Sequence, residues 1–167
     1  MKLIIQLPAW NEEAHLPEAI AALPREVDGF DAVEVLVIDD GSDDGTAEVA
    51  RAAGAEVVRL PVHRGLAVAF STGIRHGLER GADVIVNTDA DSQYDARDIP
   101  NLVQPILDGR AQMVIGDRQV HTLKHFSATK KLLQKIGSWV VRRISGTGVT
   151  DATSGFRAIS RSAAMKL

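Results

Sequence analysis

The chain has 167 residues, a formal net charge of −3, 45% hydrophobic and 25% charged residues, and no cysteine. These values are typical of one globular domain with a sizeable core. Without cysteine the chain has no disulfide framework, no thiolate metal site and no cysteine nucleophile, which fits a cytosolic location.

Short apolar runs alternate with helical patterns along the chain. The runs at 2–7, 33–38, 56–60, 83–87 and 112–115 predict five strands. Helices are predicted at 11–23, 46–53, 65–79 and 98–108, with Asn11 and Asp98 as caps. Unbroken apolar strands that alternate with helices predict an α/β fold, a mostly parallel central sheet flanked by helices.

Polar residues cluster where the predicted strands end, at 8–12, 39–44, 89–93 and 116–118. In open α/β sheets, ligands bind outside the carboxyl ends of the strands. The first strand is not followed by G-x-G-x-x-G, and no G-x-x-x-x-G-K-[ST] occurs, which disfavours a redox dinucleotide domain and a P-loop.

Two carboxylates and an amide, Asp89, Asp91 and Gln93, follow the fourth predicted strand at alternate positions. The alternation of a strand would point them to one side. Hard cations such as Mg²⁺ or Mn²⁺ prefer such oxygen ligands together with substrate phosphates. The pattern predicts a metal-bridged diphosphate site, and an acidic, solvated loop is the alternative interpretation.

Five motifs occur in order on this frame: PAWNE at 8–12, VIDDGSDDGT at 37–46, DADSQ at 89–93, GDR at 116–118 and DATSGFR at 151–157. Together they resemble the motifs of inverting GT-A glycosyltransferases of family 2. The branch they are most similar to comprises the dolichol-phosphate-mannose-synthase-like enzymes, which load a sugar onto a polyprenyl phosphate. The resemblance implies a Rossmann-like nucleotide-diphospho-sugar transferase fold over residues 1–167.

The resemblance implies a donor site for a nucleoside diphosphate sugar. Trp10 stands where the family usually has tyrosine, so an aromatic wall is kept; a core aromatic is the alternative. The implied metal ligands are Asp91 and Gln93, with Asp89 as an additional candidate, and the metal would neutralise the diphosphate leaving group. The residues implied to contact the donor are Pro8, Trp10, Glu12, Ile38, Asp40, Asp89, Ala90, Asp91 and Gln93.

The resemblance also implies an acceptor site. Arg118 belongs to a GSR-like motif and would reach the acceptor phosphate, a task that suits the bidentate guanidinium group. Lys130 matches a second basic acceptor-phosphate position, and Asp91 and Arg118 are the residues expected to carry catalysis. A phosphate acceptor is already an anion, so it needs no general base, whereas a hydroxyl acceptor does. Asp151 is the only carboxylate after Asp117; we interpret it as structural or as ordering a loop, and a general base is the alternative.

The segment 125–146 has apolar residues at helical spacing and several lysines and arginines. It predicts a basic amphipathic helix that lies at a membrane interface with anionic headgroups, and a helix packed on the core or on a partner subunit is the alternative. No apolar stretch approaches the roughly 20 residues that span a bilayer. The rest of the chain is acidic, which disfavours nucleic acid as a partner.

These observations predict a metal-dependent, inverting hexosyltransferase, with GDP-mannose or UDP-glucose as leading donors and dolichyl or undecaprenyl phosphate as acceptor. It would act at the cytoplasmic face of the membrane as a peripheral protein. The alternatives are transfer to a saccharide or protein hydroxyl and a non-catalytic nucleotide-sugar-binding domain. Family members continue beyond the position of Leu167, so the sequence is expected to be a C-terminally truncated catalytic domain.

Overall fold

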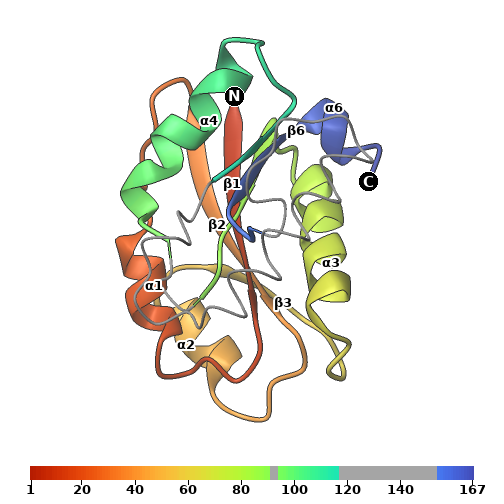
Figure 1. Cartoon of the computed structure of the whole chain (residues 1–167). Helices are drawn as coiled ribbons and strands as arrows, with labels where there is room; N and C mark the ends of the chain where they lie inside the picture. The colour runs from red at the N-terminus through yellow and green to blue at the C-terminus, as the bar shows by residue number, and fades with distance from the viewer. Residues whose placement is uncertain (91–93, 117–153) are drawn as a thin grey trace, which may run out of the picture.

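The computed structural model describes residues 1–90, 94–116 and 154–167. Strands and helices alternate through most of the chain (Figure 1), as the apolar pattern predicts. In chain order the elements are β1 Lys2–Ala9, α1 Leu16–Ala22, β2 Ala32–Asp39, α2 Thr46–Ala52, β3 Glu56–Arg59, α3 Leu66–Glu79, β4 Val84–Asn87, the 3₁₀ helix η1 Ala96–Asp98, α4 Ile99–Leu107, β5 Met113–Ile115, β6 Arg157–Ser160 and α6 Arg161–Ala164.

Within the described residues the strands form a six-stranded sheet in the order β3-β2-β1-β4-β6-β5. The pairs β1–β2, β1–β4 and β2–β3 are parallel, whereas β6 is antiparallel to both β4 and β5. The predicted α/β fold with a mostly parallel sheet is therefore confirmed. Strand β6 was not among the five predicted strands; it has four residues, and α6 follows it directly.

The central strand β1 packs on helices at both faces of the sheet (Figure 1). Its residues Leu3, Ile5 and Leu7 belong to a core cluster with residues of α1, α2 and α4. Ile4 belongs to a second cluster that includes residues of α3 and α6. Because successive strand side chains point to opposite faces, a strand covered on both sides has to be apolar throughout, and β1 and β4 are nearly so.

Two polar side chains interrupt this apolar interior. Gln6 is fully buried in β1, and Asn87, its neighbour in β4, is 3% exposed. The Gln6 Nε2 group donates to Asn87 Oδ1 at 2.8 Å and to the carbonyl of Phe70 in α3 at 3.4 Å. Asn87 Nδ2 in turn donates to the carbonyl of Gly155 at 2.8 Å. The two amides thereby connect β1, β4, α3 and the segment that precedes β6.

The first helix begins later than the sequence predicts. Helix α1 starts at Leu16, and Asn11 does not cap it; Asn11 has a φ of 56° and its side chain accepts a hydrogen bond from the Asp43 N–H at 2.9 Å. Asn11 is a good cap by composition, but its amide is used to bind the loop after β2. Asp98 precedes α4 as predicted, although Asp95 is the residue whose side chain caps the preceding 3₁₀ turn.

Helix α3 approaches β1 closely at a glycine. A Cβ atom at Gly73 would lie 2.4 Å from Gln6 Oε1 and 2.7 Å from Ile38 Cδ1. We predict that G73A lowers the free energy of unfolding by up to about 2 kcal/mol, because an overpacking cost of up to about 3 kcal/mol is offset by about 1 kcal/mol of helix propensity gained from alanine. Thermal unfolding measures the effect. S71A, at an exposed site of the same helix, is the matched control, and equal midpoints for the two variants would contradict the prediction.

Candidate functional site

The carboxyl ends of β1, β2 and β4 lie side by side at one edge of the sheet. The register pairs Ala9 with Asp39, so β1 and β2 end at the same level, and it pairs Gln6 with Asn87, so β4 ends three residues earlier. Loops that leave parallel strands at this edge form the usual ligand site of such sheets. The predicted donor residues that the structure describes all lie on or directly after these ends: Pro8, Trp10, Glu12, Ile38, Asp40, Asp89 and Ala90.

The remaining predicted site residues lie outside the described residues. These are the metal ligands Asp91 and Gln93, the acceptor-phosphate residues Arg118 and Lys130, and the segment 125–146. Their roles stay predictions. The residues on either side of the 117–153 segment are described. The Gly116 N–H donates to the Phe156 carbonyl at 2.8 Å, so these two flanking parts of the chain lie next to each other.

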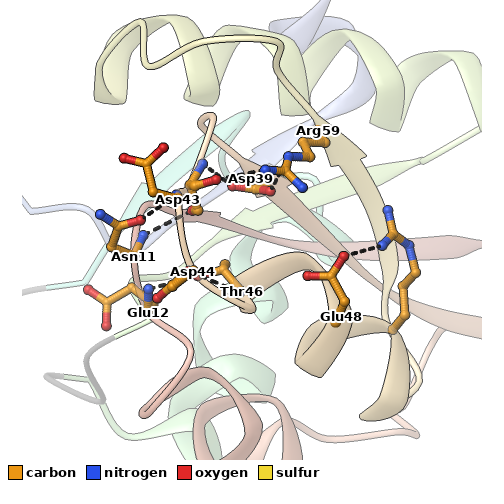
Figure 2. Close-up of polar contacts among 10 residues, drawn as sticks. Asn11, Glu12, Asp39, Asp43, Asp44, Thr46, Glu48 and Arg59 are labelled. Atoms are coloured by element: carbon orange, nitrogen blue, oxygen red, sulfur yellow. Dashed lines mark hydrogen bonds and ion pairs between the residues drawn. The ribbon is translucent and has the colours of Figure 1, made fainter.

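The loops after β1 and β2 are joined by reciprocal hydrogen bonds (Figure 2). The Asn11 N–H donates to Ser42 Oγ at 2.9 Å, and the Glu12 N–H donates to Thr46 Oγ1 at 2.9 Å. In the other direction, the Gly45 N–H donates to Glu13 Oε2 at 3.0 Å. The two loops are therefore held together by the side chains of Asn11, Glu13, Ser42, Asp44 and Thr46.

Asp44 is the main acceptor at this junction. Its Oδ1 accepts from the Thr46 N–H at 3.0 Å and from the Thr46 hydroxyl, and its Oδ2 accepts from the Glu13 N–H at 3.2 Å. Desolvation raises the pKa of Asp44, but the hydrogen bonds from Thr46 and Glu13 together outweigh it and hold the pKa below its usual value. Asp44 thus has a structural role at the start of α2.

Asp39 ends β2 and is fully buried. Its Oδ1 accepts from the Ser42 N–H at 2.9 Å, and its Oδ2 lies 3.3 Å from Arg59 Nε in an ion pair that lacks hydrogen-bond geometry (Figure 2). Arg59 also donates to the Ser42 carbonyl at 2.7 Å. Asp39 and Arg59 therefore hold the first turn of the loop from both sides.

Asp40 organises the loop that leads into α3. The side chain is 3% exposed, and its Oδ1 and Oδ2 accept from the N–H groups of Arg64 at 2.9 Å and Gly65 at 2.7 Å. His63 Nδ1 lies 2.9 Å from Asp40 Oδ2. The helix predicted at 65–79 is present as α3, and residues 63–65 form the loop that leads into it. The link from this loop to Asp40 was not predicted, because its only signal in the sequence is the glycine, whose φ is 90°.

Trp10 presents an aromatic surface at this edge of the sheet. Its indole is 47% exposed and therefore lies outside the core. The His63 imidazole stacks on it with ring centroids 4.1 Å apart and an interplanar angle of 29°. Because Asp40 holds His63, the position of the indole depends on the loop after β2 as well as on its own loop. An exposed indole backed by a fixed ring is suited to stacking with a planar ligand group.

Asp89 follows β4 and lies against the segment that enters β6. A Cβ atom placed on Gly155 would lie 2.7 and 2.8 Å from the two Asp89 carboxylate oxygens. Tyr94 stacks on Phe156 with centroids 5.0 Å apart, and its hydroxyl accepts from the Gly155 N–H at 3.0 Å. A cavity of about 260 Å³ lies beside Asp89, between α1 and the residues 94–97.

The described residues test the predicted metal site only in part. In residues 1–90, 94–116 and 154–167, no group of three or more His, Asp or Glu side chains is placed to hold a metal ion. Of the predicted ligands this part of the chain contains Asp89 alone, whose carboxylate is the hard oxygen donor that Mg²⁺ and Mn²⁺ prefer. In the same part of the chain, the helices are all too short or too polar to cross a bilayer.

Comparisons with known proteins agree with the motifs. The family model for glycosyl transferase family 2 matches residues 4–167. The chain is 36% identical over 165 residues to an undecaprenyl-phosphate mannosyltransferase of Micrococcus luteus, covering 95% of this chain and 66% of the relative. It is 32% identical over 174 residues to a polyprenol monophosphomannose synthase of Mycolicibacterium smegmatis, covering 99% of this chain and 64% of the relative. The chain thus spans about two thirds of the length of these relatives.

A solved structure shares the fold. The crystal structure of glucosyl-3-phosphoglycerate synthase from Mycobacterium tuberculosis, in complex with Mn²⁺, UDP-glucose and phosphoglyceric acid, matches with a TM-score of 0.72 and 27% identity. The match covers 96% of this chain and 57% of the solved chain. The similarity therefore extends over nearly the whole of this chain.

The hydrogen bonds to Asp40 lead to a prediction about the 63–65 loop. Asparagine has one acceptor oxygen where aspartate has two, so D40N leaves the Arg64 or the Gly65 N–H without its partner. A hydrogen bond to a charged group contributes about 1.5–3 kcal/mol, so amide exchange at that residue should accelerate by roughly tenfold or more. Hydrogen exchange followed by NMR measures it. D43N, at the exposed neighbouring acid, should leave both amides unchanged, and equal exchange in D40N and wild type would contradict the assignment.

Proposed function

This chain belongs to glycosyltransferase family 2, and we propose that it transfers a hexose from a nucleoside diphosphate sugar to a polyprenyl phosphate. The observation that carries the proposal is the meeting of three loops at the carboxyl edge of the sheet, where an exposed indole and the Asp89 carboxylate lie at strand ends. The mannosyltransferases of Micrococcus luteus and Mycolicibacterium smegmatis act by name on polyprenyl phosphates, which supports the acceptor class.

The donor half of the proposal uses the described loops. Trp10, backed by His63, stacks on the nucleobase, and the β1 and β2 loops surround the nucleoside. Asp91 and Gln93, with Asp89, hold a divalent cation, Mg²⁺ or Mn²⁺. When bound, this cation neutralises the diphosphate leaving group as a Lewis acid. GDP-mannose and UDP-glucose are the donors that we favour.

The acceptor half uses the segment between β5 and β6. Arg118 and Lys130 bind the acceptor phosphate; an oxygen of this phosphate attacks the anomeric carbon while the bond to the nucleoside diphosphate breaks, which inverts the configuration. The phosphate is ionised at neutral pH, so no general base is required, and positioning and charge stabilisation supply the catalysis. Because Gly116 and Phe156 are hydrogen-bonded, this segment leaves and re-enters the described structure at one place.

We also propose where the reaction takes place. A polyprenyl phosphate is embedded in a bilayer, and the segment 125–146 has the composition of an interfacial helix, with apolar residues at helical spacing and basic residues for anionic headgroups. Peripheral attachment through this segment at the cytoplasmic face would bring the acceptor phosphate to Arg118 and Lys130.

One observation favours a second acceptor class. The solved neighbour contains phosphoglyceric acid, a small soluble phosphorylated molecule. A glycosyltransferase with this fold that acts on a hydroxyl needs a carboxylate base. Transfer to a hydroxyl is therefore the second candidate function, and a nucleotide-sugar-binding domain without turnover is the non-enzymatic alternative.

A direct assay separates these functions. The protein is incubated with GDP-mannose or UDP-glucose, Mn²⁺, and either undecaprenyl phosphate in detergent or free sugars and phosphoglyceric acid, and the products are followed by mass spectrometry. Formation of hexosyl undecaprenyl phosphate supports the proposal. Products on a soluble hydroxyl acceptor alone would replace it with the second candidate. Donor binding without any product, in this chain and in the longest native chain, would favour the binding domain.

The predicted metal ligand Asp91 gives a binding test that does not depend on turnover. Without its carboxylate the cation loses a ligand, so D91A should abolish the part of nucleoside diphosphate binding that requires Mn²⁺. Calorimetry with and without Mn²⁺ measures that part. D98N, at an exposed acid nearby, is the control and should bind as wild type does. Equal Mn²⁺ dependence in D91A and wild type would remove Asp91 from the metal site.

The exposed indole gives a second binding test. Base–aromatic stacking contributes about 1–3 kcal/mol per base, so W10A should weaken nucleoside diphosphate binding by roughly tenfold or more. W10Y keeps an aromatic ring and should retain most of the affinity. Fluorescence or calorimetric titration measures both variants. If W10A and W10Y bind equally well, the indole does not contact the base.

A further inference from the structure

Gly155 is held on both sides by side chains from elsewhere in the fold. Its N–H donates to Tyr94 Oη at 3.0 Å, and its carbonyl accepts from Asn87 Nδ2 at 2.8 Å. The Tyr94 ring stacks on Phe156, and Ser154 Oγ lies 3.2 Å from Tyr94 Oη. The segment 154–156 therefore has a defined position relative to the end of β4.

The orientation of Asn87 is set by the sheet interior. Asn87 Oδ1 accepts from Gln6 Nε2 at 2.8 Å, and Gln6 is fully buried. With Oδ1 engaged in this way, the Nδ2 group is directed at Gly155. A buried amide that lost one of these partners would be left unsatisfied, at a cost of about 1–3 kcal/mol. The interior of the sheet thus determines where the Gly155 carbonyl lies.

The Asp89 carboxylate rests on Gly155. A Cβ atom at position 155 would lie 2.7 Å from Oδ1, 2.8 Å from Oδ2 and 3.0 Å from Cγ of Asp89. Backbone strain does not require a glycine at this position, since the φ angle of Gly155 is not positive. Alanine is compatible with this backbone, so the contact that excludes a side chain is the one with the carboxylate.

We propose that Gly155 is a positioning residue of the donor site, which sets the orientation of the Asp89 carboxylate through direct packing, with Tyr94 and Asn87 holding Gly155 in place. The inference rests on the proposed function, because it gives Asp89 its role toward the nucleoside diphosphate sugar. Packing against a fixed backbone restricts the carboxylate before the donor binds. A site held in its productive geometry loses less conformational freedom when ligand binds.

The test is a double-mutant cycle between Gly155 and Asp89. G155A displaces the Asp89 carboxylate and should weaken the binding of GDP or UDP in the presence of Mn²⁺ by about tenfold. Loss of a residue that orients a ligand-binding side chain typically weakens binding by about 10- to 100-fold, and we expect the lower value here. In a D89A background the carboxylate is absent, so adding G155A should change the affinity by less than about twofold. Calorimetry measures the four proteins.

A second variant tests the same contact without adding volume. Y94F removes the hydroxyl that accepts from Gly155 and keeps the ring that stacks on Phe156. It should weaken Mn²⁺-dependent nucleotide binding in the wild-type background and have no further effect in D89A. Thermal unfolding without nucleotide identifies loss of fold in either variant, and Y94F decides the result if G155A does not fold.

The outcomes separate the inference from the proposed function. The positioning role would be overturned if G155A or folded Y94F bound nucleotide with wild-type affinity. It would also be overturned if these changes weakened binding equally in the D89A background. In either case, nucleotide binding by the wild-type chain would still support the proposed function. A wild-type chain that binds neither GDP nor UDP with Mn²⁺ would overturn both.

Discussion

Buried polar groups at the strand ends determine how this protein is arranged, because each of them has to be hydrogen-bonded inside the fold. Asp39 and Asp40 end β2 with almost no solvent exposure, and Gln6 and Asn87 lie in the middle of an apolar sheet. A buried carboxylate or amide without partners costs free energy comparable to a large part of a domain's stability. Backbone N–H groups of the surrounding loops are the partners of Asp39 and Asp40, and this requirement defines the shape of those loops. The two amides bond to each other and to the carbonyl groups of Phe70 and Gly155.

This requirement changes how the acidic motif at 39–44 is understood. By composition, the acids there are equally suited to a ligand and to a turn. In the structure, Asp39 holds Ser42, Asp44 holds Thr46 and Glu13, and Asp40 holds the loop at 63–65. Asp39, Asp40 and Asp44 thus build the loops, and Trp10 is the exposed group that they place. A donor contact from Asp40 remains a prediction, and it would have to be made alongside the hydrogen bonds to Arg64 and Gly65.

The parts of the fold that could be predicted are those encoded by local patterns. The apolar runs located β1, β2 and β4 to within two residues, and the polar clusters at their ends located the candidate site. Strand β6 was not predicted, because Arg157–Ser160 is polar at both ends and contains no apolar run, and the strand is held by pairing with β4 and β5. Asn11 was predicted to be a helix cap because the residues around it in the sequence do not indicate its hydrogen bond with the distant Asp43 N–H. The contacts of His63 with Trp10 and of Gly155 with Asp89 escaped prediction for the same reason.

The position of β6 connects the two halves of the proposed reaction. β5 runs parallel to β4 and ends at Ile115, and β6 is antiparallel to both, so it begins at the same edge of the sheet. The residues predicted to bind the acceptor, Arg118 and Lys130, lie in the chain between these two strands. The chain returns to the sheet through Gly155, which packs on the Asp89 carboxylate. A change in how residues 154–156 enter β6 would therefore displace Asp89, a predicted donor residue, so Gly155 links the chain that follows the predicted acceptor residues to the predicted donor site.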